Sequence, residues 1–557
     1  MMRLVRLVVF ILLAGGTAEA ASTSAVADAA MRGDREAVRA ALAGKADVNA
    51  TQIDGTTALH WAVEHDDVEL AELLLTAGAR VSARTREGVM PLQLAAINGS
   101  AAMLGRLIKS GADPNAPLTP AGDTALMFAA RTGKADAVRL LLEARADVNA
   151  KESWGGTTAL MWAVTQGHVE AARLLIAAGA DVNARSHYVA AANGRGFEGR
   201  TPVASRAEEK VEEFASGWLT PLMFAARDGA LDLARLLADA GADVDAVAGD
   251  GKTALALAIF DGNYDLALFL VDRGADVNKA DAQRFTPLFW AVDRRNMETA
   301  PNFPWMVTTD AMPLIHELLD AGADPNAEGP GYTALQTVTW IRKSGGGDND
   351  PSPQGSGNMT SLEFVKKLVA HGANLNARMT KRVNVGLTSL NTNGATAFFL
   401  AARTADADMM RLLAKLGADP LLPNVDNSTP LMAAAGLGTR SPGEDAGTES
   451  EVIEAMQVAL DLGADINAVD NNGETAMHGA AYKNLPGAVQ FLVDKGANID
   501  IWNRKNKHGW TPLLIAEGYR FGNFKPSPET SAVIQKAMRA AGLSTVVEPP
   551  APERVSR

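Results

Sequence analysis

The chain has 557 residues, of which 47% are hydrophobic and 21% are charged, so it is long and apolar enough to bury a large core. Its net charge of −13 argues against nucleic-acid binding, which needs clustered Lys and Arg side chains to displace counterions. The absence of cysteine excludes disulfides, cysteine-ligated metals and thiol nucleophiles.

The N-terminus has the pattern of a signal peptide. Two arginines precede an apolar run over Leu7–Gly16, and a small-x-small site follows at Ala18–Ala20. The run is too short to cross a bilayer comfortably. We therefore expect cleavage after Ala20 and a periplasmic or secreted protein, with an uncleaved anchor as the alternative. A chain without cysteines fits a bacterial periplasm.

A six-residue segment, written GADVNA with variants, recurs along the chain. Successive copies are 33 or 34 residues apart where the spacing is regular, and the longer gaps indicate insertions into the same period. The Asp of this segment, or the residue in its place, is found at Asp47, Arg80, Asp113, Asp147, Asp181, Asp243, Asp276, Asp324, Asn374, Asp419, Asp465 and Asn498.

One regular unit, TQIDGTTALHWAVEHDDVELAELLLTAGARVSA, predicts two short helices. Its Asp-Gly pair signals a tight turn, and Thr57 has the side chain of a helix N-cap. A first helix is expected to about Glu64, and a second over Val68–Thr76, where apolar residues recur at helical spacing. Gly78 can end the second helix in the left-handed conformation. Neither helix is long enough to be stable alone.

The segments DGTTALHWA, TPLMFAA, TPLMAAA and ETAMHGAA, with LLLEARADVNA and LLIAAGADVNA, resemble the ankyrin-repeat family. The resemblance implies an all-α ankyrin-repeat solenoid of about twelve helix-turn-helix units with short β-hairpin fingers. The sequence departs from the family pattern at the His of the first helix, which is kept only at His60 and His478. The replacements are Met127, Met161, Met223, Phe289 and Met432.

One position of the first helix, here called the aromatic slot, holds a large ring in many units. A large apolar residue repeated in this way predicts a framework between adjacent repeats, and a row of ligand-contacting aromatics is the alternative. The slot residues are Trp61, Phe128, Trp162, Phe224 and Trp290.

Insertions interrupt the repeat in its middle and C-terminal portions. Two lengthen fingers, at Arg185–Gly217 and Arg378–Asn391. Three separate the two helices of a unit, at Asp293–Thr309, Arg342–Thr360 and Gly436–Ser450. We expect the finger insertions to emerge beside the first-helix face and the inter-helix insertions to emerge at the opposite end of the unit.

The repeat and its insertions predict the organisation of the chain. The expected segments are a signal peptide at 1–20, an N-terminal capping repeat at 24–50, regular repeats at 51–184, a repeat with a long finger insertion at 185–246, a regular repeat at 247–279, repeats with insertions at 280–468, C-terminal repeats and a cap at 469–543, and a disordered tail at 544–557.

No catalytic, cofactor or metal motif is predicted. GRGFEG at 194–199 has the spacing of a dinucleotide-binding loop, but it lies in a finger insertion rather than between a strand and a helix. The acidic side chains of Asp348 and Asp350 are too few for a calcium loop. We expect no cofactor, no metal and no catalytic residue.

Partner binding is expected on the finger tips and the first-helix face, as the family resemblance implies. Among these residues, Trp154, Trp218 and Trp510 lie in turns, where Trp is a frequent interface anchor; stapling of neighbouring fingers is the alternative. The candidate protein-binding residues are Asp54, Thr56, Glu64, His65, Asp123, Arg131, Trp154, Thr157, Gln166, Trp218, Arg227, Asp228, Lys252, Phe260, Phe285, Arg294, Tyr332, Trp340, Arg403, Tyr482, Lys483 and Trp510.

The resulting prediction is an exported, non-enzymatic, monomeric scaffold that binds one or more proteins through its fingers and concave face, and no nucleic acid. A cell-wall or glycan-binding module is the alternative, because turn aromatics can stack on sugars. An enzyme with catalysis carried by the insertions, and a secreted protein with a host target, are further alternatives.

Overall fold

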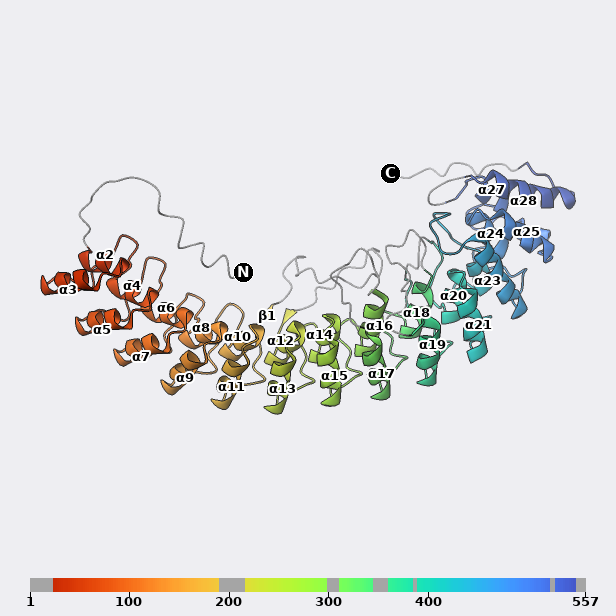
Figure 1. Ribbon diagram of the computed structural model, residues 1–557. Coiled ribbons are helices and arrows are strands. Elements are labelled where there is room, and N and C mark those ends of the chain that lie inside the picture. The colour runs from red at the N-terminus through yellow and green to blue at the C-terminus, as the bar shows by residue number, and fades with distance from the viewer. Residues whose placement is uncertain are drawn as a thin grey trace. The chain divides into compact units, whose positions relative to one another are not determined.

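A computed structural model describes residues 24–189, 216–297, 310–343, 359–383, 388–520 and 526–546. The signal-peptide prediction, most of the predicted tail and much of the insertions at 185–217, 293–309 and 342–360 lie outside these residues. The described residues form 27 helices and one two-stranded antiparallel sheet. Apart from the single-turn α26, the helices follow one another in pairs along the chain (Figure 1).

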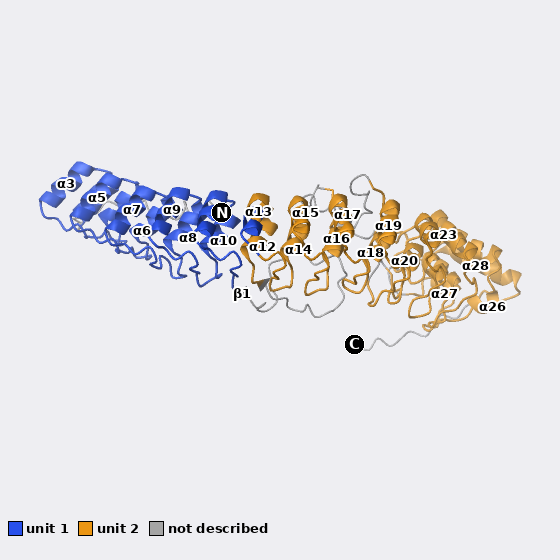
Figure 2. Ribbon diagram, turned by 90° about the horizontal axis from the view of Figure 1, so that it is seen from below, with its two compact units in different colours: residues 1–187, 235–242 blue, residues 188–234, 243–557 orange. Residues whose placement is uncertain are grey.

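The chain divides into two compact units, one made of residues 1–187 and 235–242 and the other of residues 188–234 and 243–557 (Figure 2). The helices that lie wholly in the first unit are α2 (Ala25–Met31), α3 (Arg35–Ala43), α4 (Ala58–Glu64), α5 (Val68–Thr76), α6 (Pro91–Asn98), α7 (Ala101–Lys109), α8 (Ala125–Thr132), α9 (Ala135–Glu143), α10 (Ala159–Thr165) and α11 (Val169–Ala177).

The remaining elements are β1 (Tyr188–Val189), β2 (Ser216–Gly217), α12 (Pro221–Asp228), α13 (Leu231–Asp239), α14 (Ala254–Phe260), α15 (Tyr264–Asp272), α16 (Pro287–Met297), α17 (Met312–Asp320), α18 (Ala334–Ile341), α19 (Ser361–Ala370), α20 (Ala397–Arg403), α21 (Ala407–Leu416), α22 (Pro430–Ala434), α23 (Glu449–Asp461), α24 (Ala476–Tyr482), α25 (Pro486–Asp494), α26 (Ile499–Trp502), α27 (Pro512–Ala516) and α28 (Pro528–Ala540).

Local sequence explains where the helices begin and end. In α8 and α10 the hydroxyls of Thr124 and Thr158 accept hydrogen bonds from the N–H groups three residues later, which satisfies donors that have no partner within the helix. Proline opens α12, α16, α22 and α27, where its missing N–H is not needed. Gly78 has a φ of 90°, so the chain can turn after α5. The predicted bounds of α4 and α5 are confirmed.

Within each unit the first helices of successive pairs pack on one another, and the second helices form a second row beside them. In the first unit, α4 packs on α2 and α6, and α5 packs on α7. In α5, for example, Leu70, Ala71 and Leu74 are buried. The ankyrin-repeat solenoid predicted from the sequence is confirmed. The predicted β-hairpin fingers are not general, because among the described residues only β1 and β2 pair as strands and the other fingers are turns.

The recurring GADVNA segment links each repeat to the next. Asn49 Oδ1 accepts a hydrogen bond from the N–H of Arg80 (2.8 Å), and Asn49 Nδ2 donates to the carbonyl of Gly78 (3.1 Å). Asn149 makes the same two bonds to Asp181 and Gly179. The Asn of the segment is therefore a polar strut between fingers, which explains why it recurs with the period of the fold.

Methionine takes over the hydrogen-bonding position of the missing histidines. Where the histidine is kept, the N–H of Thr57 donates to Nδ1 of His60 (3.2 Å). Where it is replaced, the N–H of Thr124 points at Sδ of Met127 (3.5 Å) and that of Thr429 at Sδ of Met432 (3.3 Å). Met therefore does more than fill apolar space, because its weakly accepting sulfur also lies against the N–H of the N-cap residue.

Candidate functional site

The structure divides the 22 predicted binding residues by exposure. The exposed ones are Glu64, His65, Trp154, Gln166, Trp218, Arg227 and Asp228. The half-buried ones are Asp54, Asp123, Arg131, Thr157, Lys252, Phe260, Arg294 and Trp340. The buried ones are Thr56, Phe285, Tyr332, Arg403, Tyr482, Lys483 and Trp510. The first two groups are available to a partner in the folded chain, and the third is not.

Trp154 is presented on a finger that a buried carboxylate holds in shape. The side chain of Trp154 is 88% exposed, whereas Glu152 is only 4% exposed. Glu152 accepts hydrogen bonds from the N–H of Trp154 (2.6 Å), Gly155 (2.9 Å) and Thr157 (2.8 Å), and from Oγ1 of Thr157 (2.8 Å). Burial on its own would raise the pKa of Glu152, but these hydrogen bonds hold it below its usual value.

Two more apolar side chains are exposed at finger positions. Ile53 is 93% exposed at the turn before α4, and Trp218 is 47% exposed after β2. Ile53 was missed by the sequence analysis, although its place beside the Asp-Gly turn is the signal that could have found it. The carbonyl of Ile53 accepts a hydrogen bond from Nη2 of Arg86 (2.6 Å), so the neighbouring finger braces this tip.

Cationic side chains pack on the aromatic rings of the first helices. In the first unit, the guanidinium of Arg131 lies 5.2 Å from the ring centre of Phe128 and 5.3 Å from that of Trp162. In the second unit, Arg294 lies 4.5 Å from the ring centre of Phe260, with Lys252 5.7 Å from the same ring. The structure thus brings three predicted residues of the second unit together on α14, α16 and the adjacent finger.

The aromatic slot lies in the framework, as predicted. Phe128, Phe224 and Trp290 are buried, while Trp61 and Trp162 are half-buried. Trp290 donates from Nε1 to Oδ2 of Asp281 (3.1 Å) and lies 4.7 Å from the ring centre of Phe285. Phe285 is therefore part of the same framework, which corrects its assignment to the binding surface.

The segment Gly436–Ser450 covers part of the first-helix face and accounts for two more corrections. Arg403 Nη2 donates to Oδ1 of Asp445 (2.7 Å), and Nζ of Lys483 donates to the carbonyl of Ala446. Arg403 and Lys483 are 1% and 3% exposed as a result. In α8 and α12 the corresponding arginines, Arg131 and Arg227, are not covered in this way.

The segment Gly436–Ser450 also runs in another direction than expected, because inter-helix insertions were predicted to emerge at the end of the unit opposite the fingers. Thr439 forms a β-bridge with Thr388, so the insertion meets the finger insertion of the preceding repeat instead of emerging at the opposite end. The short α22 ends at Ala434, and Gly436 and Gly438 turn the chain with φ of 96° and 75°. A Cβ on Gly438 would lie 2.7 Å from the backbone nitrogen of Leu390, so only glycine fits this contact.

The other buried candidates are structural for separate reasons. Tyr332 is 5% exposed and packs on Phe289, with ring centres 5.4 Å apart. Tyr482 is 6% exposed and donates from its hydroxyl to Oε1 of Glu474 (2.8 Å). Trp510 is 9% exposed and stacks on His508 at 4.8 Å. Their assignment to the binding surface is therefore wrong, and so is that of Thr56, which is 8% exposed.

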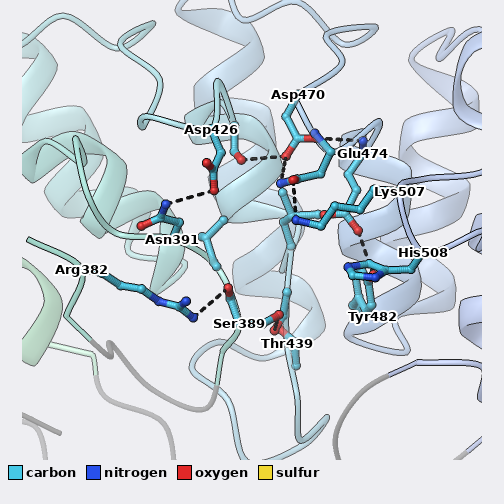
Figure 3. Close-up of a pocket in the computed structure, with 15 residues that line it drawn as sticks. Arg382, Ser389, Asn391, Asp426, Thr439, Asp470, Glu474, Tyr482, Lys507 and His508 are labelled. Carbon is cyan, nitrogen blue, oxygen red and sulfur yellow. Dashed lines mark hydrogen bonds between the residues drawn. The ribbon is translucent and has the colours of Figure 1, made fainter. Parts of the chain in front are cut away.

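The two meeting insertions wall a polar cavity of about 200 Å³ in the second unit (Figure 3). Successive fingers and Tyr482 of α24 contribute the rest of its lining. The lining residues are Arg382, Ser389, Leu390, Asn391, Asp426, Ser428, Leu437, Gly438, Thr439, Asp470, Asn472, Glu474, Tyr482, Lys507 and His508. The sequence analysis missed this cavity, because it treated the two insertions as separate loops.

Over the described ranges, no group of three or more His, Cys, Asp and Glu side chains could hold a metal ion. Within the same ranges, no helix is long and apolar enough to cross a membrane.

Comparison with known proteins identifies the family. The family model "Ankyrin repeats (3 copies)" matches residues 7–85, 26–117, 92–186, 206–281, 222–301 and 447–523. These matches together span more than half of the chain, which therefore belongs to the ankyrin-repeat family. Ankyrin repeats generally mediate protein–protein interaction.

Individual relatives match over limited stretches. The neurogenic locus notch homolog protein 1 of Xenopus tropicalis is 30% identical over 219 residues, which are 35% of this chain and 8% of that protein. The human protein of the same name is 29% identical over 215 residues, with the same two shares. A putative ankyrin repeat protein of fowlpox virus is 48% identical over 50 residues, which are 9% of this chain and 12% of that protein. The chain thus spans only a small part of the length of these relatives.

Two solved structures are also similar. The ankyrin repeat domain of human ASB11 is 26% identical, with a TM-score of 0.35, and the match covers 45% of this chain and 97% of that one. The ankyrin repeat domain of Bcl-3 is 27% identical with the same TM-score, and the match covers 42% and 94%.

Proposed function

We propose that the chain is an exported, non-enzymatic scaffold that binds protein partners through its finger tips and first-helix face. The observation that carries the proposal is the presentation of Trp154. Its indole is exposed to solvent, yet the finger below it is held by four hydrogen bonds to the buried Glu152. A rigid finger loses little conformational freedom on binding, and Trp is among the side chains that most often anchor interfaces.

A second feature supports the first-helix face as part of the binding surface. Phe260, Lys252 and Arg294 are half-buried and form a cation–aromatic cluster, with the exposed Arg227 and Asp228 on the preceding first helix. Arg and aromatic side chains are enriched at interfaces, and here they are already ordered by one another.

The proposal is tested by affinity capture from the native envelope fraction with the mature chain and a Trp154→Ala, Trp218→Ala double variant. Tyr519→Ala is the matched control, because it removes a 39% exposed aromatic side chain outside the fingers. We expect a protein partner that is retained by the native chain and the control and lost by the double variant. Direct titration with that purified partner then gives the loss in affinity.

Equal retention of the partner by all three chains contradicts the assignment to the fingers. Retention of cell-wall fragments without any protein favours glycan binding instead, because exposed indoles also stack on sugar rings. Export is tested separately, by N-terminal sequencing of the chain from cell fractions; a mature protein that begins at Ala21 in the periplasm or medium is the expected result, and an intact cytoplasmic chain contradicts export.

A further inference from the structure

The cavity between the two insertions has an acidic floor and a basic rim (Figure 3). On the floor, Asp470 and Glu474 are 6% and 8% exposed, and the half-buried Asp426 stands beside them. The rim carries the exposed Arg382 and Lys507. Charges of both signs thus line one small space, with the negative groups deeper than the positive ones.

The floor carboxylates form no ion pair with a described residue, although the charge of Lys507 acts on Glu474 from a distance. Across the described residues, no Lys, Arg or His side chain lies within ion-pair distance of Asp426, Asp470 or Glu474. Burial raises the pKa of Glu474, and this effect exceeds the opposing effects of its hydrogen bonds and of the Lys507 charge. These carboxylates are already largely removed from water, so they would stabilise a positive charge placed in the cavity.

Two of the floor carboxylates each have an oxygen that can still accept a hydrogen bond. Glu474 accepts from Tyr482 (2.8 Å) and Asn506 (2.8 Å) at Oε1, which leaves Oε2 without a bond to any described residue. Asp426 accepts from Asn391 Nδ2 (3.1 Å) at Oδ2, which likewise leaves Oδ1. The two oxygens of Asp470 already accept four hydrogen bonds, so this residue can accept few more. Its contribution to the floor is its negative charge. A ligand of this floor has to donate hydrogen bonds.

The rim offers the opposite chemistry. Nη2 of Arg382 donates to the carbonyl of Ser389 (3.2 Å), and Nζ of Lys507 donates to Oδ1 of Asn472 (2.6 Å). Neither makes an ion pair with a described carboxylate, so both cations remain available to an anionic group at the mouth.

We propose that this cavity binds a small zwitterion of the amino-acid type, with its ammonium group on Asp426 and Glu474 and its carboxylate at Arg382 and Lys507. The cavity volume of about 200 Å³ is the space of roughly seven water molecules, which suits a molecule of that size. A metal ion does not fit this role, because the described residues contain no cluster of metal-ligating side chains. The ligand would also tie together the two insertions that form the walls.

The test is isothermal titration calorimetry of the full mature chain with glycine, both enantiomers of alanine, and lysine. Methylammonium and acetate test the two ends of the ligand separately, and glucose tests a neutral polyol. We expect at least one amino acid to bind with a dissociation constant below about 1 mM, and both fragments to bind more weakly or not at all.

Two isosteric variants test whether the floor carboxylates bind the ligand. Asp426→Asn and Glu474→Gln remove charge but keep an oxygen that can accept from Asn391 and from Tyr482, so the walls should stay folded. Each should weaken amino-acid binding by at least about tenfold. Lys507→Gln should weaken the amino acids while leaving any methylammonium binding unchanged. Asp500→Asn, which alters an exposed carboxylate on α26, is the matched control.

Three results overturn the proposal. The first is no binding of any amino acid at about 10 mM, a concentration far above the expected dissociation constant. The second is binding that Asp426→Asn and Glu474→Gln leave unchanged while circular dichroism shows both variants folded, and the third is binding of glucose in place of the amino acids, which would make the cavity a polyol site. None of these results depends on the finger tips, so the scaffold function and the cavity are judged separately.

Discussion

The backbone N–H of Trp154 donates to Oε2 of Glu152 over 2.6 Å, which ties the most exposed aromatic ring of the described chain to a carboxylate that is 4% exposed. The same carboxylate accepts from Gly155 and Thr157. The finger is therefore organised from within, and the indole contributes almost nothing to that organisation. The shape of the finger thus depends on Glu152, whereas the proposed binding role belongs to Trp154.

Replacing Glu152 with Gln should loosen the finger. Glutamine has one carboxamide oxygen where four hydrogen bonds converge, so donors of Trp154, Gly155 and Thr157 lose their charged acceptor. We expect a loss of about 1–3 kcal/mol in the free energy of unfolding, measured by urea denaturation. Glu143→Gln, an exposed change at the end of α9, should change it by less than about 0.5 kcal/mol. Equal stability of the two variants would contradict the role given to Glu152.

The pH dependence of the same finger has a defined sign. The pKa of Glu152 is lower in the folded chain than its ordinary value of about 4.3. Its stabilising contribution is therefore complete above that ordinary value and is lost as the pH falls through the folded pKa. Between neutral pH and strongly acidic pH, the native chain should lose more stability than Glu152→Gln does, and denaturation at a series of pH values measures the difference. Parallel curves would show that Glu152 does not titrate with folding.

Trp154 and Trp290 should respond differently to truncation. Trp154→Ala removes an 88% exposed ring and should change the free energy of unfolding by no more than about 0.5 kcal/mol. Trp290→Ala removes a ring that is 2% exposed, packs on Phe285 and bonds to Asp281, and should cost about 3–5 kcal/mol. Thermal unfolding of both variants separates the framework residue from the surface residue. A large loss in Trp154→Ala would mean that the exposed indole staples its finger.

The repeat itself could be read from the sequence because its determinants are local. The turn, the N-cap threonine, the first-position proline and the left-handed glycine each act within a few residues, so the bounds of α4 and α5 follow from one 33-residue unit. The struts made by Asn49 and Asn149 join residues about one period apart, and only the structure shows what the recurring segment is for.

The residues of the candidate site could be predicted only where they occupy positions fixed by the repeat. Trp154 and the cluster around Phe260 occupy regular positions, so the resemblance placed them correctly on the surface. Arg403 occupies the same regular position, yet it is buried by a segment more than thirty residues away in sequence. Neither composition nor period determines where Gly436–Ser450 folds. The cavity was missed for the same reason, because it depends on the contact of Thr388 with Thr439.

Breaking the ion pair that holds this segment should be costly. Arg403 and Asp445 are 1% and 9% exposed, so Arg403→Met leaves a buried carboxylate without its closest cation. We expect a loss of about 3–5 kcal/mol and faster proteolysis within 436–450. The exposed pair Arg411–Glu454 is the matched control, and Arg411→Met should cost less than about 1 kcal/mol. Unchanged proteolysis in Arg403→Met would show that the segment is held by other contacts.

His478 should make the C-terminal repeats sensitive to acid. Its ring is fully buried, and Nδ1 accepts from the N–H of Thr475 (3.2 Å). Burial lowers the pKa of His478 to about 4, compared with an ordinary value of about 6.5. Between these two values the unfolded chain binds a proton that the folded chain does not, so stability falls as the pH drops from 6.5 to 4.

The sequence supplies the substitution that tests this effect. Met127 and Met432 occupy the same helix position in other repeats and place a sulfur at the N-cap, so His478→Met should fold without titrating. Urea denaturation at pH 7 and pH 4 should show a smaller acid-induced loss in His478→Met than in the native chain, by an amount on the order of 3 kcal/mol. His65→Met provides an exposed control. If His478→Met loses as much stability in acid as the native chain does, the buried histidine is not the cause, and the acid sensitivity has to come from carboxylates such as Glu152.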